Sequence, residues 1–233
     1  MNLVMATNLD VLNRMDFLIR DWKTKNDDRQ VFLSCYRLMT GNMFQAIEMD
    51  EFHDRVWIST LLHRFANYYF DALECYDCGK TSPKIWQEVH QCTAELNLRQ
   101  VQYLLMGVNA HINYDLVLTL FDLLDQEWPH LSREEQQLRY EDHCKVNEII
   151  ATSIDQVQDE LINPSDLLME WMDHVFGNLD EYLISSLITH WRQEVWDQAC
   201  VLLGTKGIEH REILRAKLER SVLKRNRILA IDF

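Results

Sequence analysis

Four predicted helices contain a histidine followed four residues later by an amide or carboxyl side chain. The pairs are His63/Asn67, His111/Asp115, His143/Asn147 and His190/Glu194. Residues four apart lie on one face of a helix, so each pair can share a hydrogen bond or offer two neighbouring metal ligands. His111 and Asp115 lie inside the apolar run 103–124, where neither side chain is expected to face water. This pair is therefore the strongest candidate for a functional site.

A buried ionisable pair must be hydrogen bonded, neutralised or bound to a metal, because an unpaired buried charge is unstable. The metal hypothesis places Zn²⁺ or another divalent ion on His111 and Asp115, with His63 as a further ligand. Such an ion would supply hydroxide for attack on an ester or phosphoester. Without a metal, His111 is predicted to be a general base oriented by Asp115. The alternative is a structural network in which amide and carboxyl groups hold neutral histidines.

Other polar and aromatic residues are expected to surround the pair and bind a small-molecule ligand. The predicted substrate-binding residues are Asn109, Asn113, Asn67, Tyr68 and Asn147. Tyr68 begins a run of three aromatic residues that point around a helix and cannot all face one core, so at least one is expected to line a cavity or an interface. Cys75 and Cys78, with His90 and Cys92, could form a zinc site, but cysteines at a helix end are the favoured interpretation.

The apolar spacing predicts that long helices position these residues. Helices are expected to begin near residues 8, 28, 51, 82, 97, 132, 164, 180 and 208, and Gly41 is expected to follow the end of the second. No segment alternates with the two-residue period of a strand. The fold prediction is therefore one all-α domain over 1–233, an orthogonal or bundle-like array of seven to nine helices around a buried central helix at about 100–125.

The net charge of the chain limits which kinds of molecule it is expected to bind. The chain has 37 acidic and 23 basic side chains, a net charge of −14, which argues against general binding to nucleic acid. A basic C-terminal helix at about 208–229 is expected to lie against the acidic body or to bind an acidic protein partner. The sequence has neither a secretory signature nor an uninterrupted apolar segment long enough to span a membrane, so a cytoplasmic protein with free thiols is expected.

Several segments together resemble one protein family. The run Gly107-Val-Asn-Ala-His-Ile-Asn-Tyr-Asp-Leu116 is similar to the Asn-Ala-His-Ile-Asn-x-Asp-Leu signature of an uncharacterised bacterial and fungal domain-of-unknown-function family. Weaker similarity is found in three further segments and around Trp86. These are Phe65-Ala-x-x-Tyr-Phe-x-x-Leu73, Asp142-His-x-x-Val-Asn147 and Arg192-x-x-x-Trp196-x-x-Ala199.

The resemblance implies an all-helical domain and brings no reaction with it. It adds Arg192 to the predicted catalytic residues and Asp142 to the predicted metal ligands, within one polar centre. A more distant likeness is to the zinc phospholipase C and P1 nuclease class, in which histidine and carboxylate pairs on helices bind zinc; this chain lacks that class's N-terminal Trp ligand and full ligand set. The leading hypothesis is a small-molecule enzyme or ligand-binding protein, with a metal-assisted hydrolase of an ester or phosphoester as its enzymatic form. The alternative is a cytoplasmic interaction protein with a structural polar network.

Overall fold

The computed structural model describes residues 2–95, 98–159 and 181–230, and these contain helices but no strands. The α-helices are α1 (Asn2–Lys25), α2 (Arg29–Glu48), α3 (Arg55–Asp77), α4 (Lys84–Glu95), α5 (Gln100–Ala110), α6 (Val117–Leu124), α7 (Arg133–Asp159), α9 (Glu181–Gly204) and α10 (Ile208–Leu229). A π-helical turn, His111–Leu116, joins α5 to α6, and a short 3₁₀ turn, Trp128–His130, precedes α7. The predicted all-α fold is confirmed.

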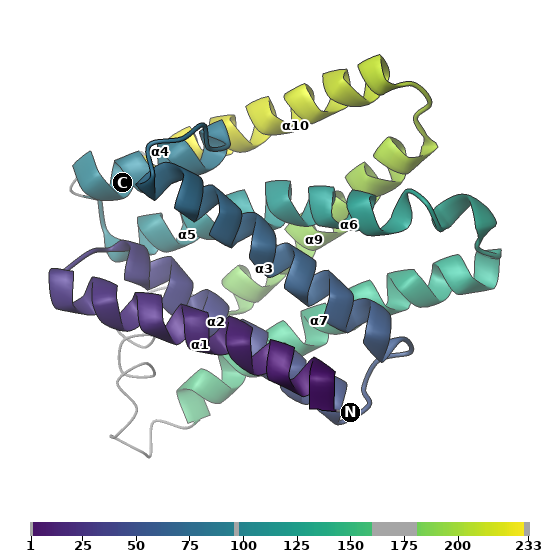
Figure 1. Ribbon diagram of the computed structural model, residues 1–233, viewed down its shortest axis with the longest axis horizontal. Helices are drawn as coiled ribbons and strands as arrows, with labels where there is room; N and C mark the ends of the chain where they lie inside the picture. The colour runs from purple at the N-terminus through teal and green to yellow at the C-terminus, as the bar shows by residue number, and fades with distance from the viewer. Residues whose placement is uncertain (1, 96–97, 160–180, 231–233) are drawn as a thin grey trace.

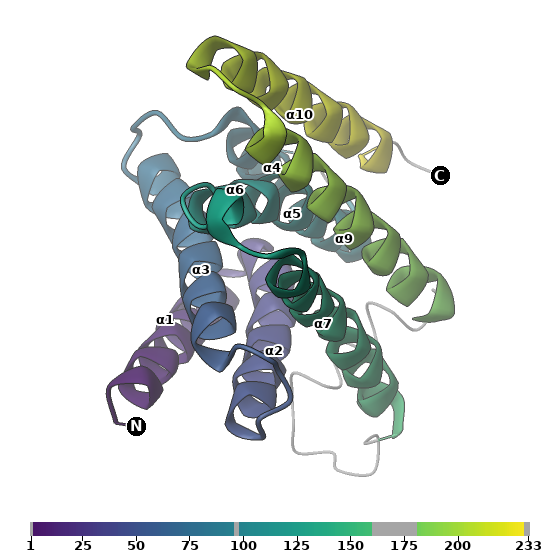
Figure 2. The same cartoon turned by 90° about the vertical axis from the view of Figure 1, so that its right-hand side faces the viewer.

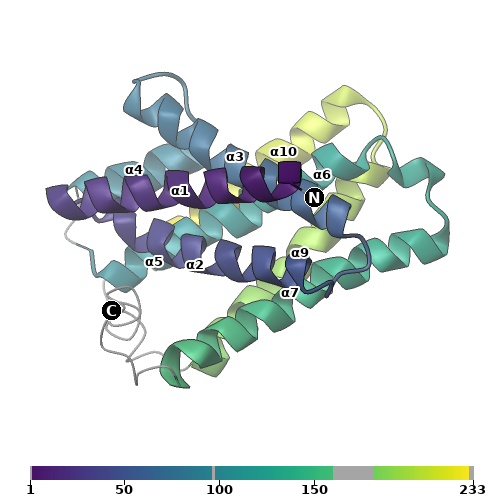
Figure 3. The same cartoon turned by 60° about the horizontal axis from the view of Figure 1, so that its bottom comes forward.

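The helices enclose one connected apolar core with a single helix through its centre. Figure 1 shows α5 and α6 running through the middle of the molecule, and α3 crossing in front of them. In Figure 2, α2 and α3 lie on one side of this central helix, α7 and α9 on another, and α10 beyond α4 and α5. Figure 3 shows α1 running alongside α2. The central helix is thus surrounded by the other helices.

The central helix runs continuously over Gln100–Leu124, so the buried helix predicted at about 100–125 is confirmed. Its length and apolar composition would suit a membrane span, but 72% of its most apolar window is buried among the other helices, which is also expected of a core helix. The π turn in its middle was not predicted. Such a turn inserts an extra residue into the helix and is often found at functional sites.

The predicted end of the second helix at Gly41 is wrong, because α2 continues through Gly41 to Glu48. A glycine inside a helix costs about 1 kcal/mol relative to alanine. Met43, Phe44 and Ile47 follow Gly41 and are all buried, so tertiary packing outweighs this local preference. The helix predicted from residue 164 lies outside the described residues.

Two local features fix neighbouring helices in place. Gly107 on α5 lies so close to α2 that a Cβ there would be 2.5 Å from a Phe32 ring atom and 2.9 Å from the Phe32 Cβ. At the other end of the chain, basic residues of α10 pair with acids of the body, Arg211 with Asp125 at 2.8 Å and Arg225 with Glu194 at 3.1 Å. α10 therefore lies against acidic side chains of its own chain, and its binding to a protein partner stays a prediction.

Candidate functional site

The π turn carries both residues of the strongest predicted pair. His111 Nδ1 lies 2.9 Å from Asp115 Oδ2, and the indole N–H of Trp86 on α4 donates to the same oxygen at 2.9 Å. Because Oδ2 already accepts a hydrogen bond from Trp86, we assign the proton to His111 Nδ1, which then also donates to Asp115. All three side chains are buried. The carboxyl group thus fixes both the orientation and the tautomer of the imidazole.

Burial controls the protonation of this pair. It lowers the pKa of His111 below its ordinary value and raises the pKa of Asp115, while the hydrogen bond between them opposes both shifts. His111 is therefore neutral at pH 7. With the proton on Nδ1, the lone pair of Nε2 is a hydrogen-bond acceptor and a potential base.

The second ring nitrogen of His111 has no hydrogen-bond partner among the described residues, although it is fully buried. Aromatic rings surround the imidazole. The ring of Phe65 stacks on it with centroids 3.6 Å apart, and the ring of Tyr36 meets it edge-on at 4.3 Å. A buried nitrogen without a partner normally requires an explanation, because most buried polar atoms are satisfied.

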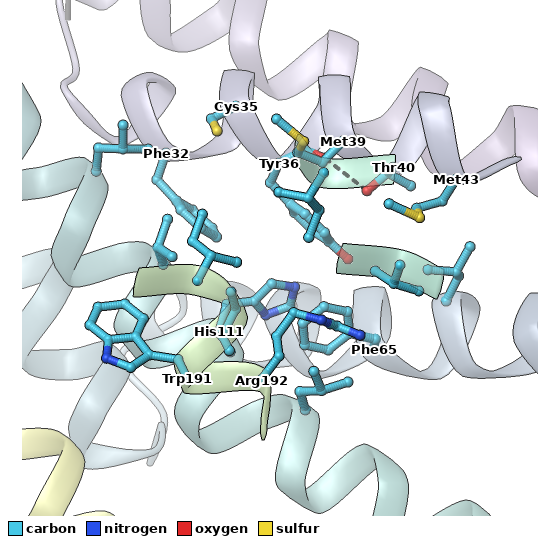
Figure 4. A pocket seen from close by; sticks show the side chains of 18 of the residues that line it. Phe32, Cys35, Tyr36, Met39, Thr40, Met43, Phe65, His111, Trp191 and Arg192 are labelled. Carbon is cyan, nitrogen blue, oxygen red and sulfur yellow. Dashed lines mark hydrogen bonds between the residues drawn. The ribbon is translucent and has the colours of Figure 1, made fainter. Parts of the chain in front are cut away.

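A cavity of about 110 Å³ lies beside His111. Side chains from α2, α3, α5, the π turn, α7 and α9 line it, and nearly all of them are apolar. Figure 4 shows the imidazole of His111 and the guanidinium of Arg192 among these apolar side chains, with Tyr36, Met39 and Thr40 facing them from α2. The structure thus places two of the three predicted catalytic residues, His111 and Arg192, at one cavity, and Asp115 directly behind His111.

Arg192 is held in place by neutral acceptors. Its Nε donates to Asn147 Oδ1 at 2.6 Å, and its Nη2 donates to the carbonyl of His143 at 2.8 Å and approaches His143 Nδ1 at 3.3 Å. Burial lowers the pKa of Arg192 to about 10, so it remains a cation at pH 7. The same burial, with the nearby guanidinium, holds the pKa of His143 well below its ordinary value. The predicted residue Asn147 therefore positions Arg192.

The predicted residues Asn109 and Asn113 lie on the opposite side of the central helix. Asn109 donates to Asn226 Oδ1 at 2.7 Å and to the carbonyl of Val222 at 3.1 Å, both on α10. Asn113 donates to Asn109 Oδ1 at 3.0 Å. This chain of amides ties α10 to α5, and neither Asn109 nor Asn113 lines the cavity.

The remaining predicted site residues lie away from the cavity. Asp142 accepts hydrogen bonds from the backbone N–H groups of His53 and Asp54, at 2.7 and 2.9 Å, before α3 begins. The Nε2 of His63 lies 2.8 Å from Asn8 Oδ1 on α1. Asn67 is exposed, and Tyr68 donates to Asp122 at 2.8 Å.

The four predicted metal ligands are therefore not brought together as one set. Within residues 2–95, 98–159 and 181–230, no three histidine, cysteine or acidic side chains are grouped in a way that could hold a metal ion. His111 and Asp115 are neighbours, whereas His63 and Asp142 have partners of their own. Of the cysteines in the weaker zinc hypothesis, Cys75 and Cys78 are free thiols.

Sequence reasoning missed Trp86 and Asn226 as members of these clusters, and also the division of the polar residues into two faces. That division has a sequence signal: residues two apart on a helix point to nearly opposite sides. Asn109 and Asn113 share one face, and His111 and Asp115 share the other. A buried Trp N–H also usually requires an acceptor, which points to Trp86.

Comparison with known proteins supports the resemblance at the level of the family. A model described as a family of unknown function (DUF5995) matches residues 9–231, nearly the whole chain. No curated protein and no solved structure matches the chain. The all-helical polypeptide that carries the His111–Asp115–Trp86 cluster therefore belongs to the DUF5995 family.

Proposed function

We propose that this protein binds a small, largely apolar molecule in the cavity beside His111, and that His111 Nε2 accepts a hydrogen bond from that molecule. One observation carries the proposal. The Nε2 atom is buried without a partner among the described residues, while Asp115 and Trp86 hold the ring so that this atom keeps its lone pair. An unsatisfied buried acceptor costs about 1–3 kcal/mol, which a ligand donor such as a hydroxyl would recover.

The contrast with His143 supports a ligand over a purely structural role. His143 is also fully buried and neutral, but its two ring nitrogens lie 3.0 and 3.3 Å from the carbonyl and the guanidinium of Arg192. A histidine that only holds the fold together is expected to have such partners on both sides. His111 has a protein hydrogen-bond partner at Nδ1 but none at Nε2 among the described residues, and His111 itself lines the cavity.

The same arrangement suits catalysis. A neutral imidazole that is oriented by a carboxylate through Nδ1 and has a free Nε2 lone pair is the general-base half of many hydrolytic sites. In the enzymatic form of the proposal, His111 would take a proton from a bound hydroxyl group or from a water that attacks an ester. This reaction rests on the binding proposal, because the substrate must first occupy the cavity.

Binding of simple alcohols tests the proposal. We expect 1-hexanol and 1-butanol to bind saturably, with resonances of cavity residues shifting in NMR spectra. Ile188→Trp should fill the cavity from α9 and weaken binding at least about tenfold. Val201→Trp is the matched control, because Val201 is exposed on the same helix and does not line this cavity. If neither alcohol binds saturably, or if Ile188→Trp binds as well as wild type, the proposal is wrong.

The metal hypothesis has its own test. Metal analysis of protein purified without an affinity tag, before and after addition of Zn²⁺ or Mn²⁺, measures bound ion directly. A metal-assisted hydrolase requires an ion that is retained near one equivalent and lost in His111→Leu. Less than about a tenth of an equivalent in both samples would leave His111 as a metal-free acceptor or base.

A further inference from the structure

We propose that the molecule bound in this cavity is a small carboxylic acid, and that Arg192 binds its carboxylate. The inference rests on the proposed function, since it names the class of ligand for the same cavity. It adds a second polar contact, an anion at Arg192, to the hydrogen bond that a donor makes with His111, and a probe molecule can make either contact alone. The two contacts can fail independently.

The first observation is the charge balance around Arg192. The side chain is only 5% exposed, and its hydrogen bonds go to an amide oxygen, a backbone carbonyl and a neutral ring nitrogen. These bonds use Nε and Nη2, whereas Nη1 makes none with a described residue. No carboxylate of the described chain forms an ion pair with this guanidinium. A buried cation with neutral partners alone is poorly compensated.

Two other arginines of the chain form ion pairs with carboxylates. Arg29 pairs with Asp27 and Asp77 at 2.6 and 2.7 Å, and Arg139 pairs with Asp54 and Glu127 at 2.7 and 3.2 Å. Both are more exposed than Arg192 and therefore need a counter-ion less. Acidic residues are in excess in this chain, 37 against 23 basic ones. Among the described residues, the buried Arg192 therefore lacks the carboxylate partner that the more exposed Arg29 and Arg139 have.

The second observation is the position of Arg192 at the cavity. Its side chain is the only permanently charged group among the described residues that line it, and the rest of the lining is almost entirely apolar. Figure 4 shows the guanidinium projecting from α9 among the side chains of the cavity. A planar guanidinium binds a carboxylate through paired charge-assisted hydrogen bonds. An apolar body would then fill the remaining space.

The volume limits the body of the ligand. An apolar cavity of about 150 Å³ accommodates benzene, so a cavity of about 110 Å³ suits a body of about four to six carbon atoms. Met39 and Met43 belong to the lining, and their flexible side chains allow some expansion. Hexanoate therefore has a suitable size and presents a carboxylate to Arg192 without a donor for His111. 1-Hexanol, of matched length, presents the hydroxyl donor for His111 without a charge.

The decisive comparison uses the wild-type protein. We expect hexanoate to bind at least about tenfold more tightly than 1-hexanol at pH 7, because its charge-assisted hydrogen bonds to Arg192 should outweigh the single neutral hydrogen bond that 1-hexanol donates to His111. Acetate, which lacks the apolar body, should bind about a hundredfold more weakly than hexanoate. If 1-hexanol binds and hexanoate binds equally or more weakly, the carboxylate inference is wrong and the proposed function stands. If neither binds, the proposed function itself fails.

Two variants locate the effect. Arg192→Gln should remove the preference for hexanoate and leave binding of 1-hexanol within about threefold of wild type. The matched control is Arg225→Gln, since Arg225 pairs with Glu194 and does not line the cavity. It should keep the full preference. Retention of the preference in folded Arg192→Gln would contradict the assignment to Arg192; if this variant does not fold, the wild-type comparison decides alone.

Discussion

The two faces of the central helix both bury polar side chains, yet they use them differently. Towards α10, Asn109 and Asn113 form a chain of amides with Asn226. Towards α4 and the cavity, His111 and Asp115 form a cluster with Trp86. The first cluster joins two helices. The second orients one ring beside an apolar cavity.

The unused hydrogen-bonding atoms distinguish the two faces. On the amide face these atoms are Asn226 Nδ2, a donor, and Asn113 Oδ1, an acceptor, which are complementary within one cluster. On the histidine face, His111 Nε2 is an acceptor without a hydrogen-bond partner among the described residues. The hydroxyl of Tyr69, whose ring packs against Trp86, also has none. Burial of polar groups is therefore a poor guide to function by itself. It is more informative to ask whether an unpaired buried atom is a donor or an acceptor, and whether a cavity lies next to it.

Asn109→Leu should produce the largest loss of stability. It removes the hydrogen bonds to Val222, Asn226 and Asn113 and leaves their polar groups buried without partners. We expect a loss of about 3–5 kcal/mol in the free energy of unfolding, measured by chemical denaturation. Asn67→Leu, on an exposed position of α3, is the control and should change stability by less than about 0.5 kcal/mol. If Asn109→Leu changed the free energy of unfolding only slightly, the amide face would not have the structural role assigned to it.

Gly107→Ala should also destabilise the protein, by about 1–3 kcal/mol, because the new Cβ would clash with the ring and Cβ of Phe32. Phe32 lines the cavity, so binding of 1-hexanol should weaken as well. Gly41→Ala is a matched control within a helix, since its Cβ would meet only Arg37 Nη1 at 3.5 Å. It should stabilise the protein by about 0.5–1 kcal/mol in the same denaturation experiment. Equal effects of the two substitutions would contradict the close approach of α5 and α2.

His111→Leu should change stability much less than Asn109→Leu. The substitution loses the hydrogen bond to Asp115 but also removes the unsatisfied Nε2, so the two effects largely cancel. We expect the free energy of unfolding to remain within about 1 kcal/mol of wild type, while binding of 1-hexanol is lost. A loss of several kcal/mol would instead make the histidine face a structural network like the amide face.

The stability of the protein at low pH should depend on His90, which stacks on Trp86 of the histidine face with ring centroids 5.4 Å apart. Burial lowers the pKa of His90 from 6.5 to about 3. The folded state then binds fewer protons than the unfolded state, so stability is full above pH 6.5 and falls as pH decreases towards 3.

In His90→Phe, the free energy of unfolding should therefore fall less steeply as the pH decreases below 6.5. The slope should be smaller than that of wild type by about 1.4 kcal/mol per pH unit, and the two slopes should agree above pH 6.5. Denaturation curves recorded between these pH values measure the slope. An identical slope in the variant and wild type would show that His90 titrates normally.

The sequence predicted local relationships well because they follow from helical geometry. The apolar run around residues 103–124 and the four-residue spacing of His111 and Asp115 are sufficient to predict a buried helix with a paired histidine. The capping box at Ser132 and Glu135 was predicted for the same reason, and both of its hydrogen bonds are present, at 2.7 and 3.2 Å.

Long-range relationships could not be predicted in this way. Trp86 and Asp115 are 29 residues apart, and Asn109 and Asn226 are 117 apart, so their pairing depends on how whole helices pack. The π turn could not be predicted either, because the apolar spacing used for prediction is that of a regular α-helix with 3.6 residues per turn. Asn109 and Asn113 were grouped with His111 because they are close in sequence, although the helix points them the other way.

The most direct test of this difference between the two faces is the ¹⁵N chemical shift of His111 during titration with 1-hexanol. We predict a neutral imidazole with its proton on Nδ1, whose Nε2 resonance moves saturably as the alcohol donates a hydrogen bond. The side-chain amide resonances of Asn109 and Asn113 should stay unchanged. A His111 Nε2 resonance that does not move at saturating alcohol, or a proton found on Nε2, would contradict the account.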